Sequence, residues 1–92
     1  MIFEWDENKN KQNKRKHGIS FEEAIRVFAD PNLKIVLDPE EKEVRWNAVG
    51  FVGKILFVVF TERGHNRLRI ISARKATKRE INGYKNNDLR RN

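Results

Sequence analysis

The side chains best suited to act on a substrate are cations in the C-terminal half of the chain. They occupy an apolar segment and the turn before it, at Arg63, Arg67, Arg69, Arg74 and Lys75. The planar guanidinium of arginine matches phosphate oxygens, and an arginine on a rigid strand loses little freedom on binding one. Glu62 ends the preceding apolar segment. It is a candidate to position an arginine or accept a proton, although a surface ion pair is the commoner role of such a residue.

A second group of cations lies near the N-terminus, on a segment expected to be helical. Lys9, Asn13 and Lys16 share one face of a helix over 7–17, a segment without a single aliphatic or aromatic residue. A helix without an apolar face cannot pack on the protein through the usual hydrophobic contacts, so another interaction must keep it in place. Either its cations contact a ligand, or its lysine stems pack on the protein. His17 lies at the C-terminal end, where the dipole favours a cationic imidazole, so a capping role competes with proton transfer.

These two groups supply what RNA cleavage without a metal requires. The 2′-hydroxyl attacks its own phosphate, so the enzyme must align the reactants, stabilise the developing charge and move protons. The candidates for this chemistry are Arg69, Arg74, Glu62 and His17. The candidates for holding RNA are Lys9, Lys16, Arg63 and Arg67. The chain has no Cys and only two His, so we expect neither a metal site nor a cofactor. His65, in a turn signal, is expected to be solvated.

The charge balance also points to a polyanion. The net charge is +7, from 20 Lys and Arg against 13 Asp and Glu. Such an excess favours nucleic acid, whose counterions are released on binding. A membrane fits less well because no basic helix has an apolar stripe, and the longest apolar run, Ile55–Phe60, is too short to span a bilayer. The early polar residues do not form a signal peptide and cysteine is absent, so we expect a cytoplasmic protein.

Capping signals, turns and periodicity predict the elements that position these groups. Strands are expected over 2–5, 33–37, 44–52, 55–60 and 67–74, and helices over 7–17, 20–30 and 77–85. The order is therefore β-α-α-β-β-β-β-α. Consecutive strands with short connections favour an antiparallel sheet packed by helices, in a single α+β domain over 1–92 whose residues 86–92 form a frayed basic tail.

Two of these strands carry further expectations. The segment Ile55–Phe60 is apolar at every position, which is typical of a central strand covered on both faces. In 67–74, strict alternation turns one set of side chains to one face and the other set to the opposite face. The first set is Leu68, Ile70 and Ser72, and the second is Arg67, Arg69 and Ile71.

Two stretches of the sequence together resemble the signatures of the BrnT toxin family. The first comprises Phe3–Asn10, Asn13, Lys16–Ala24 and Val27–Pro31. The second comprises Thr61–Arg63, Arg69–Thr77, Glu80 and Tyr84. The resemblance covers nearly the whole chain and adds Tyr84 to the candidate RNA-binding residues. Matching residues that we interpret as core are Trp5, Phe21, Phe28, Ile70 and Ala73.

The resemblance implies a RelE-like fold and a type II toxin whose ribonuclease activity halts translation. It also implies a BrnA-like antitoxin partner with a ribbon-helix-helix DNA-binding part. The complex would then bind its promoter through the antitoxin and not through this chain.

Two hypotheses from different classes follow. The first is a metal-independent endoribonuclease toxin that leaves a 2′,3′-cyclic phosphate. In it Arg69 and Arg74 hold phosphate, Lys9 and Lys16 guide RNA, and Glu62 or His17 transfers a proton. The second is a non-catalytic basic module that binds nucleic acid or a protein, with the polar helix and the basic hairpin as its docking surface.

Overall fold

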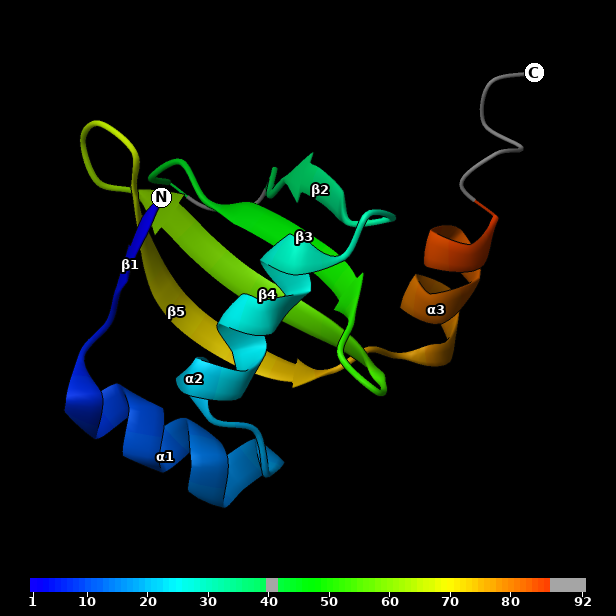
Figure 1. Cartoon of the computed structure of the whole chain (residues 1–92), viewed down its shortest axis with the longest axis horizontal. Helices are drawn as coiled ribbons and strands as arrows, with labels where there is room; N and C mark the ends of the chain where they lie inside the picture. Colours follow the sequence, from blue (N-terminus) through cyan, green and yellow to red (C-terminus); the bar gives the residue numbers. More distant parts are fainter. Residues whose placement is uncertain (40–41, 87–92) are drawn as a thin grey trace.

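The computed structural model describes residues 1–39 and 42–86, which form one sheet with helices packed on it (Figure 1). The strands lie in the order β1-β5-β4-β3-β2. The predicted order of elements and the α+β class are confirmed. Most of the expected basic tail, at 87–92, lies outside the described residues. The elements are β1 (Ile2–Glu4), α1 (Glu7–His17), α2 (Phe21–Ala24), the 3₁₀ helix η1 (Ile25–Ala29), β2 (Lys34–Leu37), β3 (Trp46–Phe51), β4 (Ile55–Glu62), β5 (Arg67–Lys75) and α3 (Lys78–Lys85).

The sheet is mixed, so the predicted antiparallel arrangement is confirmed for β2 to β5 but not for β1. Strands β2 to β5 form an antiparallel meander, as expected from their short connections. Strand β1, however, runs parallel to β5, with Phe3 paired to Leu68 and Glu4 paired to Arg69. Nothing local sets the direction of β1, because the helices and three strands separate it from β5 in the sequence.

A bulge in β5 changes the direction of its side chains. Val59 pairs with Ser72 but Phe60 pairs with Ile70, which leaves Ile71 as an extra residue. The strict alternation predicted for this strand is therefore wrong beyond Ile70, since Ser72 takes the same face as Val59.

The bulge also brings the arginines of β5 to one face of the sheet. Arg69 pairs with Thr61 and Arg74 pairs with Phe57, and these two β4 residues lie on the same face because they are four positions apart. Without the extra residue, Arg69 and Arg74 would point to opposite faces, because they are five positions apart. We call the face that carries Arg67, Arg69 and Arg74 the arginine face.

The opposite face, which we call the helix face, carries the hydrophobic core. Helices α2 and η1 cross it, as Figure 1 shows in front of the sheet. The rings of Phe28 and Phe60 meet edge to face at 5.2 Å. A Cβ at Gly50 would lie 2.8 Å from the Cβ of Val27, so a glycine is required for η1 to approach β3 this closely. The buried core comprises Ile19, Phe21, Ala24, Val27, Ala48, Leu56, Val58, Phe60, Leu68, Ile70 and Ala73.

Strand β4 is central, as predicted, but only one of its faces is fully covered. On the helix face, Leu56 and Val58 are completely buried. On the arginine face, Ile55, Phe57 and Val59 remain half-buried. The basic surface therefore rests on a partly apolar floor.

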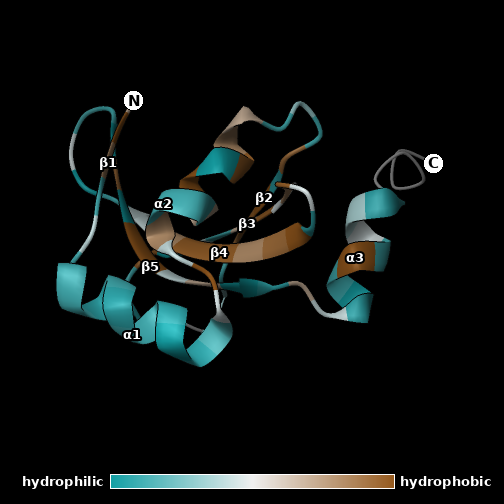
Figure 2. Cartoon of the chain, turned by 60° about the horizontal axis from the view of Figure 1, so that its bottom comes forward, coloured by the Kyte–Doolittle hydropathy of each residue, from teal (hydrophilic) through white to brown (hydrophobic). Residues whose placement is uncertain are grey.

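Helix α1 packs through buried amides instead of an apolar stripe. Figure 2 shows it hydrophilic along its whole length, in contrast to β4. Asn10 and Asn13 are the buried residues of this helix. The side chain of Asn10 accepts a hydrogen bond from the Phe21 N–H at 2.7 Å and donates to Glu22 at 2.9 Å. Asn10 thereby joins α1 to the first turn of α2, and no lysine stem is needed to hold the helix in place.

Asn13 binds the helix to the sheet by replacing a neighbouring strand. Its Nδ2 donates to the carbonyl of Ala73 at 2.7 Å, and its Oδ1 accepts from the N–H of Ala73 at 3.1 Å. The same Nδ2 donates to the Ile19 carbonyl at 2.8 Å. Because β1 pairs with β5 only as far as Arg69, no described strand lies beside the edge at Ala73, and the amide satisfies both of its backbone groups.

Replacing Asn13 by alanine is expected to destabilise the protein by about 2–4 kcal/mol, because it leaves buried backbone groups without partners. Urea denaturation measures the change. Lys11→Ala, at an exposed site of the same helix, is the control and should stay within about 0.5 kcal/mol of the parent. Equal stability of the Asn13 variant and the parent would contradict the edge-pairing role.

Candidate nucleic-acid interface

A pocket of about 240 Å³ lies where α1 meets β5, and it collects side chains that the sequence placed far apart. It is lined by Lys9, Gln12, Asn13, Lys16, His17, Ile71 and Ser72. We call it the α1–β5 pocket. The structure thus brings together three predicted site residues, Lys9, Lys16 and His17. The sequence does not indicate a role for Ser72, because strict alternation predicts that its side chain points to the same face as Leu68 and Ile70. The bulge in β5 instead directs this side chain to the α1–β5 pocket.

Local capping signals set the position of these cations. The Asp6 side chain accepts hydrogen bonds from the N–H groups of Asn8 and Lys9, and so starts α1. Gly18 ends the helix in the left-handed conformation, at φ 74°. Among the described residues, the side chains of Lys9, Lys16 and His17 have no hydrogen-bond or ion-pair partner in the protein. Their donors are therefore available to a ligand.

A glutamate on β1 holds two arginines of the arginine face. The Oε2 of Glu4 lies 3.1 Å from Nη1 of Arg69, and its Oε1 lies 3.3 Å from Nη1 of Arg67. Desolvation raises the pKa of Glu4, but hydrogen bonds from Arg69 and Arg67 outweigh it, so this pKa is below its ordinary value. Glu4 was not among the predicted site residues, because only the parallel register of β1 and β5 places it beside Arg69.

Arg74 is held on the arginine face by α3. Its Nη1 and Nη2 donate to the two carboxylate oxygens of Glu80 at 2.8 and 2.9 Å, and its guanidinium lies 4.2 Å from the centre of the Phe57 ring. The hydrogen bonds to Glu80 raise the pKa of Arg74. Those from Arg74 lower the pKa of Glu80, which also closes a capping box with Thr77. Arg74, which the sequence predicts to bind phosphate, therefore already pairs with a carboxylate of the protein itself.

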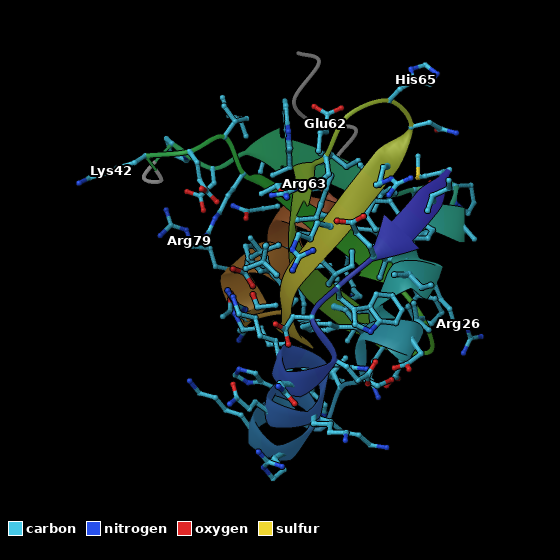
Figure 3. The ribbon with its side chains drawn as sticks, turned by 90° about the vertical axis from the view of Figure 1, so that its left-hand side faces the viewer. Arg26, Lys42, Glu62, Arg63, His65 and Arg79 are labelled. Atoms are coloured by element: carbon cyan, nitrogen blue, oxygen red, sulfur yellow. The ribbon has the colours of Figure 1, made fainter. Side chains whose placement is uncertain are left out.

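Glu62 does not join Arg69. It pairs across the strands with Leu68, so it lies on the helix face, while Arg69 points to the other side. With Arg63 and Arg67 it lines a pocket of about 530 Å³ at the hairpin end of β5. Figure 3 shows Glu62 at the opposite end of the molecule from α1, and His65 pointing away from the hairpin. Six of the nine predicted residues thus line two separate pockets, and the two candidates for proton transfer, Glu62 and His17, are far from each other.

Tyr84 fastens α3 to the loop that follows η1. Its hydroxyl donates to Asp30 at 2.5 Å. Desolvation and this hydrogen bond raise the pKa of Tyr84 to about 12. Asp30 also accepts from the backbone N–H of Phe51 at 2.8 Å. The hydroxyl predicted to contact RNA is therefore engaged within the protein.

The Glu4 contacts predict a dependence of stability on pH. Because folding lowers the pKa of Glu4 from its ordinary 4.5, the ion pairs stabilise the folded state above that pH, and their contribution is lost as the pH falls through the lower, folded-state pKa. The parent should therefore be more stable than Glu4→Gln near neutral pH. The difference should shrink below about pH 4.

Urea denaturation of both proteins at several pH values measures this difference. Glu43→Gln is a suitable control, because among the described residues Glu43 pairs with Arg45 alone, at 3.4 Å and far along the chain from β1. A parent-to-Glu4→Gln difference that stays constant down to pH 3 would contradict the assignment.

Two further properties concern only the part of the chain that the structure describes. There, no three side chains of His, Cys, Asp or Glu gather as metal ligands do. Within the same residues, none of the helices combines the length and the apolar character needed to cross a bilayer.

Comparisons with known proteins identify the family. Residues 5–80 match the model of a family described as the ribonuclease toxin, BrnT, of type II toxin–antitoxin systems. Among solved structures, the crystal structure of the Brucella abortus ribonuclease toxin BrnT is similar, with 30% sequence identity and a TM-score of 0.65 over 85% of this chain and 100% of that one. No curated protein sequence matches significantly. The chain therefore belongs to the BrnT family of ribonuclease toxins of type II toxin–antitoxin systems.

Proposed function

We propose that the protein is an endoribonuclease that needs no metal ion and that halts translation by cutting RNA in the cytoplasm. Its proposed partner is a BrnA-like antitoxin, whose ribbon-helix-helix part carries the complex to promoter DNA. The observation that supports the catalytic proposal is the α1–β5 pocket. There two lysines and a histidine converge that have no partner among the described residues, and none of the described carboxylates lines the space.

The proposed reaction uses the groups of this pocket. Lys9 and Lys16 bind the phosphate and stabilise its developing negative charge. His17 takes the proton from the 2′-hydroxyl, since imidazole is well suited to proton transfer near neutral pH. The 2′-oxygen forms a bond to phosphorus, the bond from phosphorus to the 5′-oxygen breaks, and that oxygen leaves after taking a proton from solvent water, while His17 later returns its proton to solvent. The products are a 2′,3′-cyclic phosphate and a 5′-hydroxyl.

The arginine face extends this site along the RNA backbone. Arg67 and Arg69 are held by Glu4, so they present their guanidinium groups from a rigid strand with little loss of freedom. Arg69 binds a phosphate next to the reacting one, and Arg63 and Arg67 bind the strand further toward the hairpin. Their charges add an affinity that falls as salt concentration rises.

The other predicted residues have weaker structural support. Arg74 and Tyr84 can contact RNA only by exchanging their present partners, Glu80 and Asp30. Glu62 can transfer a proton only to a group bound at the hairpin end, so we assign this step to His17.

Cleavage of purified RNA in EDTA by the partner-free protein tests the proposal. His17→Gln should lower the cleavage rate about 100-fold or more, which is the usual contribution of a proton-transfer group. Because the chain has only two histidines, His65→Gln is a matched control and should cleave at the parental rate. The parental products should carry 2′,3′-cyclic phosphate ends. Undiminished cleavage by a folded His17→Gln protein would contradict the role of His17.

A second pair of variants tests the arginine face. Arg69→Ala should slow cleavage about tenfold, because a phosphate contact from a charged donor contributes about 1.5 kcal/mol. Arg26→Ala should have no effect, since the exposed side chain of Arg26 belongs to η1, which covers the helix face. Equal rates for these two variants would contradict phosphate binding by Arg69.

One observation favours the alternative, a non-catalytic basic module. Both strand arginines expected to hold phosphate, Arg69 and Arg74, already pair with carboxylates. RNA binding without cleavage by the folded parent, with purified ribosomes as well as with free RNA, would support this alternative and overturn the catalytic proposal.

A further inference from the structure

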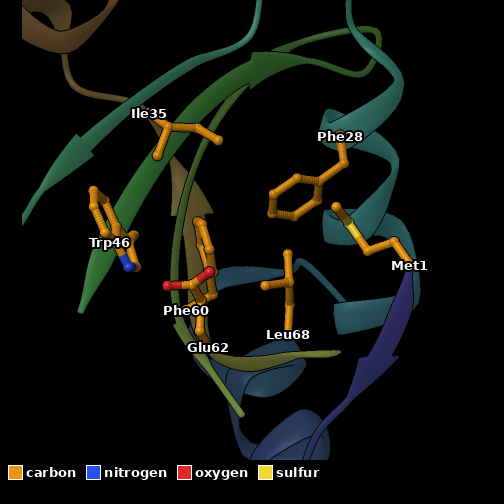
Figure 4. Close-up of a pocket in the computed structure, with 7 residues that line it drawn as sticks. All are labelled: Met1, Phe28, Ile35, Trp46, Phe60, Glu62 and Leu68. Atoms are coloured by element: carbon orange, nitrogen blue, oxygen red, sulfur yellow. The ribbon is translucent and has the colours of Figure 1, made fainter. Parts of the chain in front are cut away.

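A second cavity lies on the helix face, on the other side of the sheet from the arginine face. Its volume is about 270 Å³, and six of its seven lining residues are apolar. Figure 4 shows Phe28 and Met1 on one side, Ile35 and Trp46 on the other, and Phe60 and Leu68 between them. We call it the apolar cavity. Open apolar hollows of this kind are a common feature of the places where proteins bind other molecules.

Two polar groups at the apolar cavity lack partners among the described residues. The indole N–H of Trp46 is buried and has no acceptor. The carboxylate of Glu62 forms no ion pair or hydrogen bond with the described residues, although the protein has an excess of cations. An occupant that satisfies the buried indole must therefore offer a hydrogen-bond acceptor beside an apolar side chain. A cation on the same occupant would pair with the exposed carboxylate of Glu62. RNA does not fit inside the apolar cavity, because the lining offers its phosphates no cation, only apolar side chains and the negative charge of Glu62.

The apolar cavity opens beside β2, an edge strand of the sheet. Strand β2 pairs only with β3, so its outer backbone edge faces no other described strand. Its Ile35, Val36 and Leu37 are 44%, 49% and 52% exposed, and Ile35 also lines the cavity. Such an edge can accept an added strand through backbone hydrogen bonds, with alternate side chains of that strand directed to one face of the sheet.

We propose that an extended segment of the antitoxin pairs along β2 and inserts a large apolar side chain into the apolar cavity. A backbone carbonyl of this segment accepts from Trp46, and a lysine or arginine pairs with Glu62. This inference rests on the antitoxin partner implied by the family, and it is independent of the proposed ribonuclease residues.

Charge complementarity favours the antitoxin over a second copy of this chain. The only cation of β2 is Lys34, and its Nζ donates to the carbonyl of Gly83 in α3 at 2.5 Å. In a pairing of two β2 strands, neither copy would bring an unengaged cation of that strand to Glu62.

The two tryptophans of the chain provide a test that needs no variant. In the nuclear magnetic resonance spectrum of the full chain, the indole N–H signal of Trp46 should shift when the antitoxin encoded beside the toxin gene is added. That of Trp5 should not, because its indole already donates to Glu7 at 3.2 Å. A Trp46 signal that stays in place in the saturated complex would overturn the proposal.

Matched variants measure how much the β2 edge contributes to antitoxin binding. Ile35→Asp should weaken antitoxin binding at least tenfold in calorimetry without RNA. Phe51→Asp makes the same change at an exposed β3 residue that does not line the apolar cavity, and it should bind within twofold of the parent. Glu62→Gln should weaken binding at least threefold and reduce its dependence on salt. Parental affinity of folded Ile35→Asp would overturn the docking site, and parental affinity of Glu62→Gln would overturn the ion pair.

Two other outcomes separate the possible failures. Self-association of the chain that Ile35→Asp abolishes, with antitoxin affinity unchanged, would show that β2 serves a second copy and would overturn the proposal. Failure of the parent to cut RNA, with the Trp46 and Ile35 results as expected, would contradict the ribonuclease proposal and support this one.

Discussion

The fold depends on the side-chain amide of Asn13, which takes the place of a strand at the edge of β5. Helix α1 has no hydrophobic surface with which to pack, so a pair of hydrogen bonds to Ala73 fixes its height and rotation against the sheet. An amide is suited to this task because it presents one donor and one acceptor in a plane, as a peptide group does. The same bonds fix the position of His17 one turn further along the helix.

This mode of packing has an electrostatic consequence. A helix that packs through an apolar stripe covers its lysine stems with neighbouring side chains. In α1 two short asparagines make the contact, and the long cationic side chains extend into water beside β5. The cations of β5 are arranged differently, because Glu4 and Glu80 neutralise them in part and hold them still. The protein therefore combines exposed cations on the helix, of which Lys9 and Lys16 pair with no described residue, with cations on the strand that carboxylates hold in place.

The sequence was sufficient where local chemistry decides the structure. Asp6, Gly18 and Thr77 marked helix ends correctly, since a cap depends on residues within one turn. The spacing on α1 correctly placed two lysines on one face, and the α1–β5 pocket confirms that they lie together with His17. These features require no knowledge of distant parts of the chain.

The sequence was insufficient where contacts between distant segments decide. No turn residue in the sequence indicates the bulge at Ile71, so the predicted direction of the Ser72 side chain was wrong. The parallel register of β1 arises between segments more than 60 residues apart, so the partnership of Glu4 and Arg69 could not be foreseen. The direction of Glu62 follows from its pairing with Leu68, which the hairpin signal alone did not fix.

The two edges of the sheet differ in a way that limits how the protein can assemble. Within residues 1–39 and 42–86, one edge is the three-residue β1, continued by Asn13 at Ala73, while the other is the apolar β2. A fibre that grows by adding strands needs two receptive edges on every subunit, because each copy must join one neighbour on either side. A sheet with one receptive edge stops growing once that edge is occupied. At the first edge, the three residues of β1 and the amide of Asn13 leave only a short stretch of backbone for an added strand, which disfavours edge-to-edge growth of this toxin beyond two molecules.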